Sequence, residues 1–211
     1  MEHRVDLNKS SGHADEPSNA ELAGCCGHHH FEKATEVLSD EHRVIERVLA
    51  VVDRLTRAPV EDSLASWKKA LDFIRNFADQ CHHLKEEKIL FPAMEERGMP
   101  REGSPIGVML MEHEEGRGYV RSMLAALTLA EAKNSAAKDS LLSNARAYLR
   151  LLKEHILKED EILFKIADDV IPADEQKTLV RTFEEHEAKE MVTAVHEKYL
   201  RIAEELERSV P

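Results

Sequence analysis

Apolar residues recur every three or four positions through four long segments of the chain, at about residues 31–57, 63–97, 105–131 and 135–169. This spacing is the period of an amphipathic helix that buries one face. The fourth stripe, for example, ends at Ile162 and Ile166. Short connections separate the segments, so neighbouring helices must run antiparallel. The pattern predicts an all-α protein built on an up-down-up-down four-helix bundle.

Polar sequence flanks the bundle on both sides. Residues 1–30 show no apolar period and predict a flexible N-terminal arm. The charged C-terminal region predicts one extra helix from about 174 to 208. The expected organisation is therefore an arm at 1–30, a bundle at 31–170 and a helical extension at 171–211.

The composition of 33% charged and 5% aromatic residues, with a formal net charge of −12, is typical of an acidic helical protein. An acidic chain without a basic cluster is a poor partner for nucleic acids or anionic membranes. No apolar run is long enough to span a bilayer, and the first residues lack the apolar core of a signal peptide. Three cysteines, two of them adjacent, do not make a disulfide framework. These features predict a cytoplasmic protein with no nucleic-acid or membrane partner.

The apolar stripes contain polar residues where a bundle core calls for leucine. Each stripe carries a histidine, and the second and fourth add a glutamate four residues later, within the similar stretches HHLKEEKILFP and HILKEDEILF. Residues four apart share one face of a helix, so both members of each pair must point into the core. The full set is His42, His82, Glu86, His113, His155 and Glu159.

A carboxylate in a bundle core is costly unless it is paired or bound to a metal ion. The chain twice places a lone histidine before a His-x-x-x-Glu pair, and this pseudo-symmetry suits two metal ions bridged by Glu86 and Glu159. Histidine nitrogens and carboxylate oxygens without thiolates favour iron or manganese over structural zinc, and two irons, two manganese ions or a mixed site all suit this set. Six protein ligands for two ions leave coordination positions for a small molecule.

The neighbours of this set are expected to take other roles. His83 lies about 100° round the helix from His82 and is expected to flank the site. Glu87 and Asp160 would become ligands only if the helical register slipped, and Glu46 lies at the edge of its stripe.

Further histidines and cysteines lie outside the predicted set. His186 and His196 are expected to be solvated, and Cys81 is expected to pack as a small apolar residue. The tract Cys25-Cys26-Gly27-His28-His29-His30 either binds a transition metal or belongs to an incidental tail.

The segments DEHRVIE, HHLKEEKILFP, PIGVMLMEHEE and HILKEDEILF make residues 33–169 resemble the hemerythrin-like, HHE cation-binding family. The resemblance implies a non-haem di-iron site inside an antiparallel four-helix bundle. Oxygen-carrying hemerythrins have a second histidine on the third helix, whereas this chain has Met109 and Arg117 at those positions. One iron would then be more open, which argues against simple reversible oxygen carriage. Arg117 either snorkels toward the bundle end or stands over the open iron.

The second and third helical segments are similar to those of proteins that repair iron centres after nitrosative stress, which also carry an N-terminal Cys-Cys-Gly segment. The primary hypothesis is a di-iron protein that binds or reacts with O2, NO or H2O2, in oxidative or nitrosative stress or in iron homeostasis. An iron or redox sensor, or an iron donor, without catalytic turnover is the alternative, and it would contact a protein partner or form a homodimer. A structural bundle without metal is the third hypothesis.

Overall fold

The structure is a computed structural model that describes residues 31–131, 134–190 and 195–209, without the side chains of residues 189–197. The predicted N-terminal arm and its Cys/His tract lie outside the described residues. Every regular element of the described part is helical, and none of these helices is long and apolar enough to cross a membrane.

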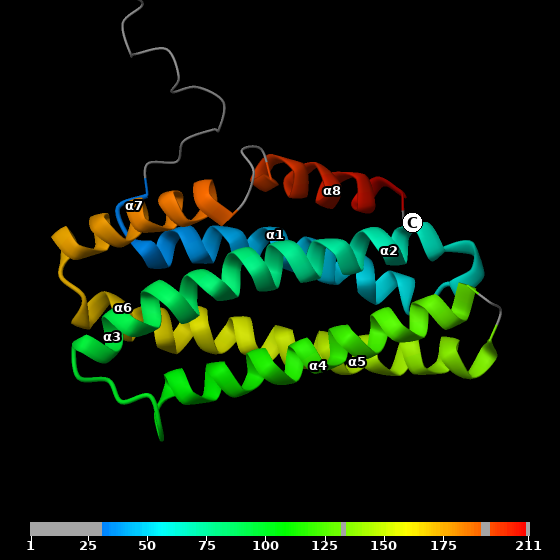
Figure 1. Cartoon of the computed structure of the whole chain (residues 1–211), viewed down its shortest axis with the longest axis horizontal. Coiled ribbons are helices and arrows are strands. Elements are labelled where there is room, and N and C mark those ends of the chain that lie inside the picture. The colour runs from blue at the N-terminus through cyan, green and yellow to red at the C-terminus, as the bar shows by residue number, and fades with distance from the viewer. Residues whose placement is uncertain (1–30, 132–133, 191–194, 210–211) are drawn as a thin grey trace, which may run out of the picture.

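Four helical rods pack side by side to form an antiparallel bundle, which confirms the predicted fold class (Figure 1). The first rod is α1 (Ala34–Leu55), and the third is α4 (Pro105–Glu131). A short 3-10 helix, η1 (Val60–Asp62), precedes the second rod. The second rod runs through α2 (Leu64–Phe73), the π-helical segments η2 (Ile74–His83) and η3 (Glu86–Leu90), and α3 (Phe91–Glu96). The fourth comprises α5 (Ser135–Lys158), the π-helical segment η4 (Glu159–Leu163) and α6 (Phe164–Val170).

The π-helical turns lie in the two rods that carry the His-x-x-x-Glu pairs. A π-helix closes its hydrogen bonds over five residues instead of four, so each turn takes up more residues than an α-helical turn. The inward face of the fourth rod therefore continues from Glu159 to the fully buried Leu163, whereas Ile162 is 51% exposed. The prediction of Ile162 as a core position assumed a regular α-helix and was wrong.

The C-terminal extension forms two helices where the sequence predicted one. α7 (Ala173–Glu190) packs on α1 and η3, and α8 (Val195–Ser209) packs on α1 and α2 (Figure 1). Phe183 of α7 and Tyr199 of α8 are buried against different parts of the bundle core. The extension therefore covers the first two rods with its own apolar side chains.

The buried apolar residues form two clusters, and a layer of polar side chains lies between them. On α1, Leu38 belongs to one cluster and Ile45 to the other, with His42 between them. On the fourth rod, Leu152 and Leu163 likewise belong to different clusters. Apolar packing at both ends therefore shields the polar layer from water.

We expect Leu163→Ala to lower the free energy of unfolding by about 2–5 kcal/mol, because it leaves a cavity at a fully buried position. Ile162→Ala should cost less than about 1 kcal/mol, because half of that side chain is already exposed. Urea denaturation of both variants in the presence of a chelator measures the difference without a contribution from bound metal. Equal losses would contradict the inward position of Leu163, and a larger loss for Ile162→Ala would indicate a regular α-helix at this point.

Candidate metal centre

The structure brings all six sequence-predicted side chains together in the polar layer. Each of them is at most 1% exposed. They come from all four rods: His42 of α1, His82 of η2, Glu86 of η3, His113 of α4, His155 of α5 and Glu159 of η4.

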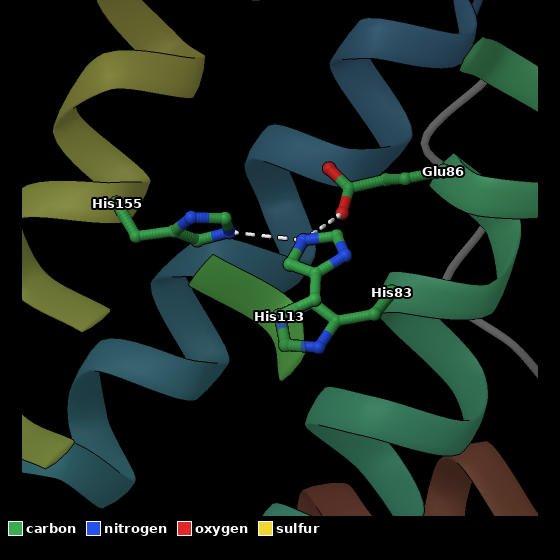
Figure 2. A group of neighbouring side chains, drawn as sticks. All are labelled: His83, Glu86, His113 and His155. Atoms are coloured by element: carbon green, nitrogen blue, oxygen red, sulfur yellow. Dashed lines mark hydrogen bonds and ion pairs between the residues drawn. The ribbon is translucent and has the colours of Figure 1, made fainter. Parts of the chain in front are cut away.

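The nitrogen and oxygen atoms of the layer fall into two groups, and within each group they lie within 4.8 Å of one another. One group comprises His42, His82, Glu86 and Glu159. The other comprises His83, Glu86, His113 and His155, whose side chains converge from three rods (Figure 2). Glu86 belongs to both groups, so the two clusters are adjacent and not separate sites.

Glu86 faces one group with each of its oxygens. Its Oε1 atom lies 3.8 Å from Nε2 of His82. Its Oε2 atom lies 3.4 Å from Nε2 of His113, and Figure 2 shows this second contact. A carboxylate placed in this way can bridge two cations, each of which also contacts one of these histidines.

Glu159 repeats this arrangement on the opposite rod. Its Oε2 atom lies 3.2 Å from Nε2 of His42, and its Oε1 atom lies 3.2 Å from Nε2 of His155. The Nε2 atoms of His113 and His155 also face each other at 3.1 Å (Figure 2). Two ring nitrogens directed at one point, with a carboxylate oxygen beside them, form the donor set that a borderline divalent metal ion prefers.

The hydrogen-bonding of these atoms fits a cation. Both oxygens of Glu86, both oxygens of Glu159 and Nε2 of His42 are buried without a hydrogen-bond partner among the described residues. Unsatisfied buried carboxylates are strongly unfavourable, and a metal ion between them removes that cost. Burial disfavours a charged His155, but the neighbouring Glu159 carboxylate raises the pKa of His155 to about 9. A cation at this position would take the place of that proton.

A ring of carboxylates orients the four histidines. Each histidine has its Nδ1 atom 2.7–2.9 Å from a carboxylate oxygen on the neighbouring rod. The pairs are His82 with Glu41, His113 with Glu87, His155 with Glu112 and His42 with Asp160. Every rod thus supports the histidine of the next one, and the fourth supports the first. Because an ionised carboxylate only accepts hydrogen bonds, Nδ1 donates and the Nε2 lone pair is left to face the centre.

Each supporting carboxylate is paired in turn with a basic side chain. The pairs are Glu41 with Lys85, Glu87 with Arg117, Glu112 with Lys158 and Asp160 with Arg43. Burial opposes ionisation of Glu41, but Lys85 and the hydrogen bond with His82 outweigh it and lower the pKa of Glu41 to about 2. The supporting carboxylate is therefore ionised at neutral pH, as its hydrogen bond to histidine requires.

These contacts give each polar residue of the repeated H-x-x-K-E-[ED] stretch a role at the centre. In the second copy, His155 and Glu159 face the centre, and Lys158 neutralises the Glu112 carboxylate that orients His155. Asp160 accepts the hydrogen bond of His42 on the next rod. One short stretch therefore supplies two groups of the centre and two of its supports.

Three further residues lie close to the six predicted ones. His83, which was expected to flank the site, is buried, belongs to one donor group and stacks on His113 with ring centroids 4.0 Å apart. The π-helical turns of η2 bring both adjacent histidines inward. Glu41 and Glu112 were not considered, although each directly precedes a predicted histidine in a repeated Glu-His pair.

Arg117 and Glu46, which the sequence placed near the site, both form ion pairs outside the centre. Arg117 neither reaches the bundle end nor stands over the centre, because its guanidinium binds Asp79, Glu87 and Glu114. Glu46 pairs with Arg43 outside the centre.

Two further predictions concern residues near the C-terminal extension. Cys81 is buried as predicted, and burial raises the pKa of its thiol. His186 is half-buried and not solvated, and the side chain of His196 lies outside the described part.

Comparison with known proteins identifies the family. The hemerythrin HHE cation binding domain matches residues 33–167, so the chain belongs to this family of cation-binding proteins. It is also 28% identical over 180 residues to the uncharacterized protein Mb2018 of Mycobacterium bovis and to the uncharacterized protein Rv1995 of Mycobacterium tuberculosis. Each alignment covers 84% of this chain and 70% of the relative. No solved structure matches the chain significantly.

We expect Glu112→Gln to weaken metal binding about 10- to 100-fold, because the amide no longer holds His155 as a charged acceptor does. The variant should still fold, because Lys158, the ion-pair partner of Glu112, is 34% exposed and can turn toward water. Glu115→Gln, an exposed change on the same helix, is the matched control and should bind metal normally. Competition with a chelator of known affinity measures the effect, and equal affinity of both variants would remove Glu112 from the supporting ring.

Proposed function

We propose that the polar layer binds two iron ions and that the protein reacts with a small oxidant such as O2, NO or H2O2. The observation that carries this proposal is the division of the Glu86 and Glu159 oxygens between two pairs of histidines. Membership of the HHE family supports cation binding. The donor atoms suit both iron and manganese, and the resemblance to the HHE family favours iron of the two.

Iron would supply the electrons for reduction of the oxidant at coordination positions that the protein leaves open. The chain's own groups prepare the site for it. The two glutamates provide negative charge in a layer shielded from water, where electrostatic attraction to a cation is strong. The supporting carboxylates hold the histidine rings in one tautomer, so that no rearrangement is needed when the metal binds. Such a role places the protein in oxidative or nitrosative stress or in iron homeostasis.

We expect the wild-type chain, produced in iron-replete cells without a histidine tag, to contain about two iron ions per chain. His82→Ala and His155→Ala should each lower that content, because each removes one ring nitrogen from a different group. His186→Ala alters a half-buried histidine outside both groups and should leave it unchanged. Elemental analysis of the purified proteins measures the ratio, and undiminished iron in both site variants would contradict the assignment.

A sensor without turnover is the second candidate, and one contact favours it. Lys85, which neutralises Glu41, also binds Glu187 of α7 and lies over the Phe183 ring at 5.8 Å. A chain of contacts thus connects His82 to the C-terminal extension. A shift of His82 at the centre would move Lys85 and, with it, α7. In this sensor, α7 or the acidic surface would then contact a protein partner or a second copy of the chain.

Turnover distinguishes the two candidates. We expect the reduced iron protein to consume O2, NO or H2O2 for as long as an external reductant is present, because open coordination positions let product leave. Electrode measurements with each oxidant follow consumption, and His155→Ala serves as the iron-depleted control. Consumption that stops after one equivalent per site would favour the sensor.

A further inference from the structure

A cavity of about 440 Å³ lies beside the metal centre, between η2, α4 and α5. Its walls include the apolar side chains of Ile74, Val120 and Leu124 together with the Tyr148 ring. Pockets of about 300–1,000 Å³ are the usual size for organic ligands, whereas a water-sized molecule needs only about 30 Å³. The cavity is therefore much larger than O2, NO or H2O2 requires.

The cavity reaches the centre through His83. This ring lines the cavity and also belongs to the donor group with Glu86, His113 and His155. Figure 2 shows His83 beside His113 in that group. Its Nδ1 atom is buried without a hydrogen-bond partner in the described part and lies 3.6 Å from Oδ1 of Asp79, another lining residue. One end of the cavity is thus a buried polar group with unused hydrogen-bonding capacity.

The charge around the cavity favours an anion. Arg75 and Arg121 line it, are exposed, and form no ion pair with any described side chain. The lining carboxylate, Asp79, is already bound by Arg117 at 2.7 Å. Both guanidinium groups are therefore uncommitted among the described side chains, and guanidinium is well suited to binding carboxylates.

We infer that this cavity binds a small organic carboxylate, with its anionic group at Arg75 and Arg121 and its apolar body along Ile74, Val120 and Leu124. The end of the ligand opposite the carboxylate then lies against His83, next to the metal centre. The placement of that end rests on the proposed metal-binding function, whereas the binding of the carboxylate does not. The cavity would bind and orient this organic molecule in addition to the small oxidant at the centre.

Calorimetric titration of the full-length iron-loaded protein with hexanoate and with benzoate tests the inference. Both probes should bind, and the uncharged counterparts 1-hexanol and benzyl alcohol should bind about tenfold more weakly, because they lack the group that guanidinium recognises. Arg75→Ala/Arg121→Ala should weaken hexanoate binding by a similar factor. Arg57→Ala/Arg208→Ala removes two exposed arginines elsewhere and should have no effect.

Two further measurements separate the cavity from the centre. Leu124→Trp should abolish probe binding by filling the cavity at a half-buried position, while the iron content stays at the wild-type value. The optical spectrum of the iron should change over the same hexanoate concentrations that the calorimeter reports. The assignment would be overturned if neither hexanoate nor benzoate bound saturably. It would also be overturned if Arg75→Ala/Arg121→Ala bound hexanoate as tightly as the control Arg57→Ala/Arg208→Ala. Binding without a spectral change would overturn contact with the centre, and low iron content in the wild type would count against the proposed function alone.

Discussion

Burial of two carboxylates in the middle of a helical bundle is the constraint on which the rest of this structure depends. Glu86 and Glu159 are fully buried, and their oxygens have no hydrogen-bond partners among the described residues. Burial and the charge of Glu159 raise the pKa of Glu86 well above its usual range, because two negative charges at this separation repel. Protonation or cation binding can relieve that repulsion. Cation binding fits this site better than protonation does, because four histidine nitrogens are directed at the same space. A cation can accept the lone pairs of these neutral imidazoles, whereas a proton shared by the two carboxylates leaves them unused.

The ring of supporting carboxylates shows how a bundle can hold such a centre rigid. Each histidine is ordered by the rod next to it, so that no rod can shift without moving a histidine of its neighbour. The basic partners keep the supporting carboxylates ionised and limit the negative charge that surrounds the centre. A cation held by these side chains would therefore bind to a preformed geometry, and its binding energy would add to the stability of all four rods at once.

The fold could be predicted because helical periodicity is a local property, and the six central residues because they interrupt apolar stripes. The other features depend on contacts between rods. Glu41 and Glu112 carry no signal of their own in the sequence, since their histidine partners, His82 and His155, lie on other helices. The π-helical turns depend on backbone hydrogen bonding that no single letter encodes, so the inward shift to Leu163 was not foreseen. The division of the C-terminal extension was missed because residues 174–208 contain neither glycine nor proline.

The two halves of the chain repeat in sequence but are not equivalent in space. Lys85 is fully buried beneath α7, where it binds Glu187, whereas the corresponding Lys158 is 34% exposed. His83 also has no counterpart, because Ile156 follows His155 in the second copy. The half that contains Lys85 is thus connected to the C-terminal extension, and the donor group that contains His83 opens toward the cavity. A symmetric centre would give two metal ions the same surroundings. Here one group lines the cavity through His83, and the other contains His82, which is linked through Glu41 and Lys85 to α7, so two bound ions would occupy chemically distinct positions.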